Sequence, residues 1–234
     1  MGYEVIPANW THYRSWDFHP ANINAIVFLS LSPQDECFVW HELNIDPKRN
    51  TTEIIAEQIA GVRSDLIYKL SRIDPLAAQN QSNTNTSVID DLNKYFKNFK
   101  REGFGHGGVW KPYDTKYHVT QIGFLRGRDH IKQRLINASL AEKPFNNNIV
   151  VKGIKKQLPT LWVSKDCKMV LQSLYKWRIE KGKPSQQWSH HCTALEGIMK
   201  EKKFRPHVEF EEDIMETRKK KYRERITSNY FKVA

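Results

Sequence analysis

Short apolar runs separated by polar turns fill the first part of the chain. The runs Tyr13–Asp17, Ala25–Leu31 and Cys37–Leu43 predict three consecutive strands, because they are short, rich in β-branched and aromatic residues, and bounded by turn formers such as Pro20 and Pro33. Strands joined by such short turns are expected to pair as a meander.

Farther along, the pattern changes to alternating helices and strands. Apolar residues recur there at helical spacing in some segments and in compact β-prone runs in others. In chain order, the predicted elements are a helix capped by Thr51 or Thr52 and ended by Gly61, a strand Leu66–Ile73, a helix that begins at Ser87 or Asp90, a strand Val109–Tyr113, a helix Val119–Leu140, a pair of short strands Ile149–Val151 and Thr160–Val163, and helices Asp166–Trp177 and Ser189–Lys202.

This order indicates one α/β domain. A meander followed by helix–strand units favours a mixed sheet with helices on its faces. The composition changes after Phe204, where the acidic "EFEED" is followed by the basic "RKKKYRER". We therefore expect a folded domain over residues 1–208 and a charged tail over 209–234, which is either a solvated arm or a contact for DNA or a partner.

The charge of the chain favours a polyanionic partner. The 234 residues carry a formal net charge of +11, and clustered Lys and Arg gain affinity for phosphates by releasing counterions. The alternative is a protein that is merely basic. Hydrophobic residues make up 39% of the chain, which is enough to build a sizeable core.

Several classes of protein are excluded by composition. The three cysteines are widely spaced and include no CxxC pair, which disfavours a zinc site or a disulfide framework and indicates a reducing compartment. No run approaches the ~20 apolar residues of a membrane helix, and no secretory signal pattern opens the sequence. We expect a protein that is not secreted and that has no membrane partner.

Nucleotide-binding motifs are also disfavoured. Gly103, Gly105 and Gly108 spell GxGxxG, but the motif leaves a predicted helix and leads into a β-prone segment, the reverse of the dinucleotide fingerprint. The sequence contains no GxxxxGK[ST] loop, so it carries no P-loop ATPase motif.

Two aspartates end two predicted strands. Asp17 closes the first strand and Asp74 closes the fourth, and in a mixed sheet these ends can lie side by side. Neighbouring carboxylates repel one another unless a cation lies between them, and oxygen ligands favour Mg²⁺ or Mn²⁺. Two such ions about 4 Å apart can promote phosphodiester cleavage. The alternative is that both are turn residues, since Asp-Pro is a common end for a strand.

The order and spacing of these segments resemble the C-terminal nuclease domain of the large terminase subunit of tailed bacteriophages. The opening "IPANWTHYRSWDFHPANINAIVFLSLSPQDECFVWHEL" is similar to that family's strand with the first catalytic Asp, its turn and two further strands. The segment "LIYKLSRIDPLAA" is similar to its second acidic motif, and "YHVTQIGFLRGRDHIKQRLI" and "TLWVSKDCKMVLQSLYKWR" are similar to later elements. The likeness runs from about Ile6 to Lys202.

The resemblance implies a fold and a metal site. The fold would be an RNase H-like three-layer α/β/α domain with a central mixed five-stranded sheet and a short auxiliary hairpin. Asp17 and Asp74 would be metal ligands of a two-metal site that binds Mg²⁺ or Mn²⁺. One departure lies in the turn after Asp17, where Phe18-His19-Pro20 stands in place of the family's frequent glycine.

The third acidic motif departs more seriously. The family has an Asp-His pair followed by "MDAL" at the start of the last helix, whereas this chain has "SHHCTAL". His190 matches the family's histidine, and Thr193 occupies the position of the acidic ligand. His190 would position a water or a phosphate, or Glu196 would supply a carboxylate from the next helical turn. Otherwise one ion is bound weakly, or the site has decayed.

The resemblance also implies partners. The activity would be metal-dependent cleavage of double-stranded DNA, cutting concatemeric phage genomes during packaging and leaving a 3′ hydroxyl. The partners would be DNA, a terminase ATPase domain, the small terminase subunit and the portal protein, in the host cytoplasm and transiently at the procapsid portal. The sequence leaves open whether an ATPase domain precedes this one or acts as a separate chain. Rival functions are a DNA-binding module without cleavage and a domain that docks a packaging motor to its portal.

Two groups of basic residues are candidates for DNA contact. Arg126, Arg128 and Lys132 lie on one side of the predicted helix Val119–Leu140, where they form either a solvated face or a track for phosphates. The second group, between the two short strands, is an arm for the DNA backbone and comprises Lys152, Lys155 and Lys156. Contacts to phosphates predict little sequence preference.

Overall fold

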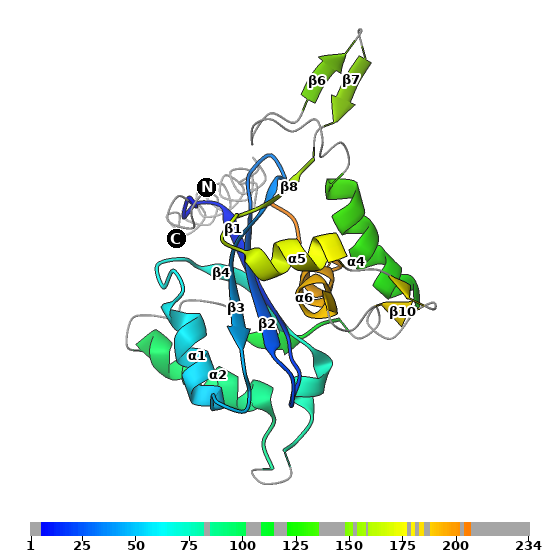
Figure 1. The fold of residues 1–234 in the computed structure, drawn as a ribbon. Coiled ribbons are helices and arrows are strands. Elements are labelled where there is room, and N and C mark those ends of the chain that lie inside the picture. The colour runs from blue at the N-terminus through cyan, green and yellow to red at the C-terminus, as the bar shows by residue number, and fades with distance from the viewer. Residues whose placement is uncertain are drawn as a thin grey trace, which may run out of the picture.

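A mixed sheet forms the centre of the molecule. The computed structural model describes residues 6–81, 85–101, 109–114, 121–135, 148–151, 154–157, 159–176, 179–180, 183–184, 188–201 and 204–206. The six strands of the sheet are β1 (Thr11–Asp17), β2 (Asn24–Leu31), β3 (Cys37–Ile45), β4 (Tyr68–Ile73), β5 (Trp110–Pro112) and β8 (Leu161–Val163), as Figure 1 shows.

The order across the sheet is β5-β4-β1-β2-β3-β8. Strands β1, β2 and β3 pair antiparallel, which is the predicted meander. Strand β4 is parallel to β1 and β5 is parallel to β4, so these three strands end at the same edge. The predicted candidate residues Asp17 and Asp74 lie at this edge.

Helices cover both faces of the sheet (Figure 1). On one face lie α1 (Thr52–Gly61) and α2 (Val88–Arg101), and on the other lie α4 (Gln121–Arg134), α5 (Lys168–Lys176) and α6 (Ser189–Met199). The predicted caps are present: the Thr51 side chain accepts a hydrogen bond from the backbone N–H of Ile54, and the Ser87 hydroxyl accepts one from that of Asp90. The predicted three-layer α/β/α architecture is confirmed.

The strand count and one pairing were predicted wrongly. The strand β6 (Asn148–Val151) forms a hairpin with β7 (Ile154–Gln157) rather than with Thr160–Val163. Leu161–Val163 is instead β8, which extends the central sheet from five strands to six by pairing parallel to β3. Leu161 is buried there in the core beneath α5 and α6, which explains its place in the sheet.

One element was not predicted, and two segments singled out in the sequence lie outside the described residues. A further two-stranded ribbon of β9 (Ile179–Glu180) and β10 (Lys183–Pro184) was not predicted. The glycines over 103–108 and the charged tail over 209–234 lie outside the described residues. Within the described residues, no helix is both long enough and apolar enough to cross a membrane.

The central strand β1 carries an arginine that sequence patterning does not reveal. The Arg14 side chain is buried, and its guanidinium carbon lies 4.6, 4.4 and 4.9 Å from the ring centroids of Tyr68, Phe96 and Trp110. Its Nε donates a hydrogen bond of 2.7 Å to the Ser71 hydroxyl. Burial lowers the pKa of Arg14 to about 10, while the three rings supply cation–π stabilisation. This interaction joins β1 to β4, β5 and α2.

On the opposite face, two glycines allow helices to approach their neighbours closely. A Cβ atom on Gly127 of α4 would lie 2.6 Å from the backbone oxygen of Glu196 in α6. A Cβ atom on Gly197 of α6 would overlap the Tyr113 ring. Gly127, which weakens the prediction of a helix from sequence, is therefore the residue that lets that helix pack against α6.

We expect Gly197→Ala to destabilise the fold by about 1–3 kcal/mol, because the fully buried Tyr113 ring has no space to move. Gly61→Ala is the control, since nothing lies within 4 Å of a Cβ atom there, and it should leave stability unchanged or raise it slightly. Urea denaturation of the two variants measures the difference. Equal stability of the two variants would show that Tyr113 yields to the added methyl group.

Candidate active site

The two predicted aspartates lie at adjoining strand ends. Trp16 of β1 pairs with Ile73 of β4, so Asp17 and Asp74 follow a pair of neighbouring parallel strands, whose typical spacing is about 4.8 Å. The backbone N–H of Asp74 also donates a 3.0 Å hydrogen bond to the Trp16 carbonyl. Both aspartates are only 8% exposed.

Strand alternation places the two side chains on the same face of the sheet. Asp17 follows Tyr13 at even spacing, and Tyr13 packs in the core beneath α6. Asp74 follows Arg72 at even spacing, and Arg72 pairs with Glu201 just beyond α6. The two carboxylates therefore point from the strand ends towards the layer that contains α6.

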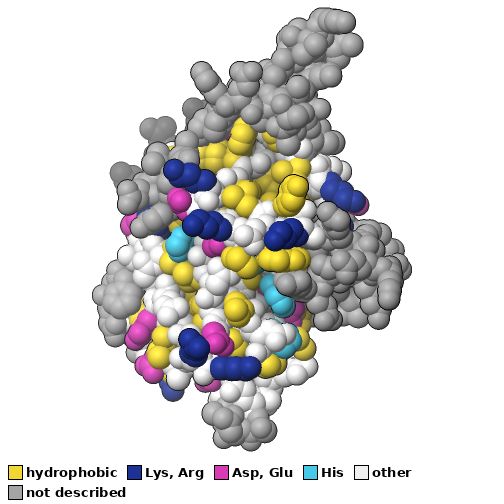
Figure 2. Space-filling model, viewed as in Figure 1, with side chains coloured by type: hydrophobic (Ala, Val, Ile, Leu, Met, Phe, Trp, Pro, Cys, Tyr) yellow, Lys and Arg dark blue, Asp and Glu magenta, His cyan; other side chains and the backbone are white. Residues whose placement is uncertain are grey.

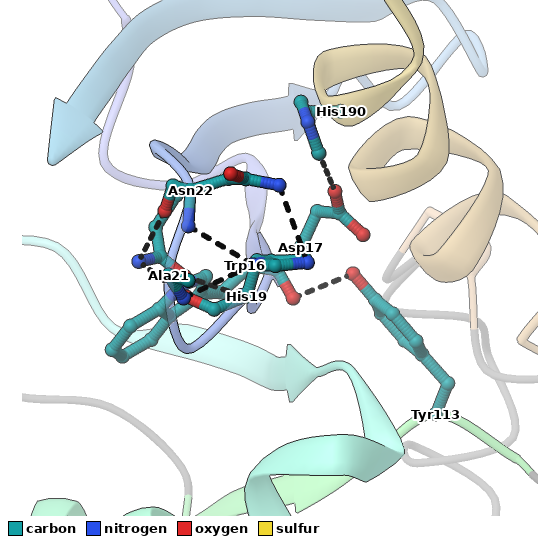
Figure 3. A network of polar contacts seen from close by, with 8 residues as sticks. Trp16, Asp17, His19, Ala21, Asn22, Tyr113 and His190 are labelled. Carbon is teal, nitrogen blue, oxygen red and sulfur yellow. Dashed lines mark hydrogen bonds and ion pairs between the residues drawn. The ribbon is translucent and has the colours of Figure 1, made fainter. Parts of the chain in front are cut away.

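His190 joins the first aspartate from across the site. Its Nδ1 lies 2.7 Å from Oδ2 of Asp17, as Figure 3 shows. The hydrogen bond to Asp17 raises the pKa of His190, against the opposing effect of burial. The imidazole therefore tends towards its charged form beside the carboxylate, and α6 is tied to the end of β1. Its neighbour His191 is buried instead, and burial lowers its pKa to about 4.

The turn after Asp17 is organised by a histidine. Nδ1 of His19 accepts hydrogen bonds from the backbone N–H groups of Ala21 and Asn22, at 3.1 and 2.9 Å (Figure 3). The His19 ring also lies 6.4 Å from that of His190, centroid to centroid. The sequence that replaces the family's frequent glycine thus builds a fixed turn at the edge of the site.

Tyr113, which follows the parallel strand β5, contacts the end of β1. The Tyr113 hydroxyl donates a 2.9 Å hydrogen bond to the carbonyl of Trp16, as Figure 3 shows. It also lies 2.9 Å from the Ser15 hydroxyl. Burial, followed by the negative charge of Asp17, raises the pKa of Tyr113 well above its usual value, so the phenol stays neutral. Tyr113 therefore fixes the backbone immediately before Asp17.

A buried lysine, Lys200, directly follows the last residue of α6. Lys200 is 4% exposed, and its Nζ lies 5.2 Å from the centroid of the Tyr113 ring. Burial lowers its pKa, while the nearby carboxylates of Glu201, Glu196 and Asp74 favour the charged form. Sequence reasoning missed Tyr113 and Lys200; a signal for Tyr113 was its place at the end of a predicted strand next to the one that ends in Asp74.

Thr193 lies on α6 between these groups. Helical periodicity places it on the same face as His190, three residues earlier, and Gly197, four residues later. His190 contacts Asp17, and Gly197 faces Tyr113. The position that resembles the family's third acidic ligand is therefore on the side of α6 that faces the strand ends, but it holds a neutral hydroxyl.

Glu196 does not join the two aspartates through a contact in the structure but forms an ion pair with Arg128. Arg128 Nε lies 3.0 Å from Glu196 Oε1, and the two side chains are 11% and 5% exposed. Burial raises the pKa of Glu196 to about 7, and the Arg128 guanidinium opposes this shift only in part. Glu196 was expected to complete the metal site, and Arg128 to lie either on a solvated face or on a track for phosphates. In the structure the two side chains form this ion pair between α4 and α6.

We expect Arg128→Met and Glu196→Met each to lower the free energy of unfolding by about 1–3 kcal/mol, since each removes one side of a largely buried ion pair. The double variant should lose less than the sum, with a coupling of about 1–3 kcal/mol. This coupling should grow from pH 5.5 to pH 8.5, because Glu196 ionises as the pH rises through its raised pKa of about 7. Urea denaturation at the two pH values measures it, and additive losses would contradict the ion pair.

The remaining basic candidates are only partly visible. Lys132 is exposed on α4. Lys152 lies outside the described residues, as do the side chains of Arg126, Lys155 and Lys156. On the face shown in Figure 2, the described Lys and Arg side chains are scattered rather than gathered into one patch.

Asp17 and Asp74 form the acidic donor set at this edge of the sheet. Asp17 and Asp74 offer carboxylate oxygens from one edge and one face, which suits a hard cation. Among the described residues, no group of three or more His, Cys, Asp or Glu side chains is arranged to hold a metal ion. The Asp17 and Asp74 carboxylates are therefore the acidic side chains at this sheet edge that would hold a divalent cation.

Comparison with known proteins gives a structural match only. No family model matches the chain, and no curated protein matches it by sequence. The P22 large terminase nuclease domain aligns with a TM-score of 0.53 and 11% identity, over 83% of this chain and 82% of that one. The chain has the RNase H-like fold of a terminase nuclease domain.

A second solved structure agrees with this terminase-like fold. The large terminase of a thermophilic bacteriophage, in complex with ADP, aligns with a TM-score of 0.50 and 15% identity over 86% of this chain. The chain spans only 41% of that protein. Identities this low establish the terminase nuclease fold alone.

Proposed function

We propose that this chain is a divalent-metal-dependent endonuclease that cuts double-stranded DNA during viral genome packaging. The observation that carries the proposal is the convergence of Asp17, Asp74 and His190 at one sheet edge of a terminase-like fold. Buried carboxylates side by side are costly unless they bind a cation, and hydrolysis of a phosphodiester is the reaction that such a site supports.

The residues have distinct roles in this proposal. Asp17 and Asp74 would hold the Mg²⁺ or Mn²⁺ ion, which when bound supplies Lewis acidity to the water and to the phosphate. His190 orients the Asp17 carboxylate through its hydrogen bond. Tyr113 fixes the end of β1 through the Trp16 carbonyl. The cut leaves a 3′ hydroxyl and needs no protein nucleophile.

The proposed partners follow from charge and fold. A net charge of +11 favours the DNA backbone, and exposed Lys132, with Lys152, Lys155 and Lys156, would contact phosphates. The terminase-like fold supports a place beside a terminase ATPase domain, the small terminase subunit and the portal protein. We place the protein in the host cytoplasm and, during packaging, at the procapsid portal.

Plasmid nicking tests the proposal directly. Supercoiled plasmid incubated with the protein should be converted to open circles and linear DNA in Mn²⁺ or Mg²⁺, and EDTA should stop the conversion. A crystal soaked in Mn²⁺ should show anomalous density between Asp17 and Asp74. Metal-independent nicking, or anomalous density elsewhere only, would contradict the proposed site.

A DNA-binding domain with weakened cleavage is the second candidate. It is favoured by Thr193 at the third ligand position and by the lack of a three-ligand group among the described residues. Retarded migration of DNA in a gel without any Mn²⁺-dependent nicking would favour this candidate.

If deletion of residues 209–234 abolished portal binding alone, the tail would be a docking element.

A further inference from the structure

A cavity of about 580 Å³ opens next to the candidate active site. It lies between the β1–β2 turn, the end of β3, the helix α5 and the start of α6, and we call it the α5–α6 pocket. His190 belongs both to its wall and to the hydrogen bond with Asp17. An occupant of this pocket would therefore lie beside the phosphate at the proposed cutting site. Its volume is typical of pockets that bind small organic molecules.

Two residues that line the pocket each carry a buried polar atom without a hydrogen-bond partner among the described residues. Ser173 is 1% exposed and His191 is 4% exposed, and both residues line the pocket. The Ser173 hydroxyl and Nε2 of His191 have no partner among the described residues. Buried polar groups are nearly always hydrogen-bonded to protein or ordered water, so these two groups leave hydrogen-bonding capacity at the pocket for a bound molecule.

The other walls define the chemistry of that ligand. Trp188 and Met169 contribute flat or adaptable apolar surface, and Asn22 and Asn44 contribute amides at the rim. Aromatic surface stacks on planar rings, and amides pair with the edges of nucleobases. Nζ of Lys176 lies 4.3 Å from the centroid of the Trp188 ring, which brings positive charge to the same side.

We propose that the α5–α6 pocket receives a nucleobase of the DNA strand next to the cut phosphate. This inference rests on the proposed function, because His190 links the pocket to the proposed metal ligand. A base reaches such a pocket when it leaves the stack, which costs least at distorted or single-stranded positions. Ser173 and His191 then bond the edge of the base, Trp188 stacks on it, and Lys176 attracts the adjoining backbone.

The test compares ligands that differ only in the base. Binding of dTMP, dAMP and deoxyribose 5-phosphate is measured by ligand-observed NMR in EDTA, so that no cleavage is required. The wild-type protein should bind the nucleotides about 10-fold more tightly than the sugar phosphate, in keeping with the contribution of base stacking. Equal binding of all three, or no binding, would overturn the inference.

Variants locate the binding to the pocket. Met169→Trp fills the cavity and should remove the preference for nucleotides, whereas Leu171→Trp, on an exposed position of the same helix, should retain it. Ser173→Ala should weaken nucleotide binding several-fold while leaving the melting temperature unchanged or raised, because it removes an unsatisfied buried hydroxyl. This second variant decides the matter if Met169→Trp does not fold. A preference that survives both Met169→Trp and Ser173→Ala places the base elsewhere.

Nicking of plasmid by the same proteins separates the two proposals. If the wild-type protein nicks plasmid but binds the nucleotides no more tightly than deoxyribose 5-phosphate, the pocket proposal is wrong and the nuclease proposal stands. If the protein binds the nucleotides more tightly than the sugar phosphate but does not nick plasmid, the pocket proposal is supported and the nuclease proposal is wrong.

Discussion

Asp17→Asn should lower Mn²⁺-dependent plasmid nicking by at least about 100-fold, because the amide offers a hard cation a neutral oxygen in place of a charged one. The same change removes the charged acceptor that holds His190 at 2.7 Å. Asp74→Asn should produce a loss of similar size, since the two side chains share one edge and one face of the sheet. Conversion of supercoiled plasmid at several Mn²⁺ concentrations measures both effects.

A matched control is available on α4. Asp129 is exposed, and Asp129→Asn should leave nicking unchanged while altering the net charge equally. The melting temperature in Mn²⁺ offers a second measurement, since a ligand that binds only the folded state stabilises it. Mn²⁺ should raise the melting temperature of the wild type and of Asp129→Asn, but not that of Asp17→Asn. Equal nicking by Asp17→Asn and the wild type would remove the aspartate pair from the mechanism.

The elements at this edge could be predicted because local signals agree there. The meander strands are strongly apolar and separated by prolines, and Asp74 precedes Pro75 at the stop of β4. The parallel pairing of β4 with β1 then brings Asp74 beside Asp17. The sequence predicted that the ends of these two strands can lie side by side, and the structure shows β1 and β4 as neighbours.

Long-range pairing was harder to predict. The strand β8 contains three residues, and nothing in so short a run indicates whether its partner is the neighbouring hairpin or β3. Glu196 illustrates the same limit on a helix. Its spacing from Thr193 suggested a shared face, but Gly127 allows α4 to pack against α6, and Arg128 then holds the carboxylate.

Buried cations were the other omission. Arginine and lysine are expected at the surface, yet Arg14 lies within a cage of three aromatic rings and Lys200 lies among carboxylates behind the site. Both depend on groups brought together from distant segments, so patterning along the chain gives no sign of them. Arg14 contacts rings on the face covered by α2, and Lys200 contacts Tyr113 on the face covered by α6.

Thr193→Asp should increase Mg²⁺-dependent nicking by about 10-fold or more, because it adds a charged oxygen ligand to a site that has two. The reasoning depends on the helix face: His190 contacts Asp17, Gly197 contacts Tyr113, and Thr193 lies between them. Without metal, a third carboxylate beside Asp17 and Asp74 should lower the melting temperature by mutual repulsion. Metal should then restore it, with a larger rise than in the wild type.

Thr193→Asn is the matched control, since it has the same shape as the aspartate variant without its charge. It should show neither the gain in nicking nor the larger metal-induced rise in melting temperature. The contrast between the two variants therefore isolates charge at position 193 from any change in helix packing. If Thr193→Asp nicks no faster and gains no more stability from metal than Thr193→Asn, then α6 does not present this position to the bound cation. The site would then work with two aspartates and His190.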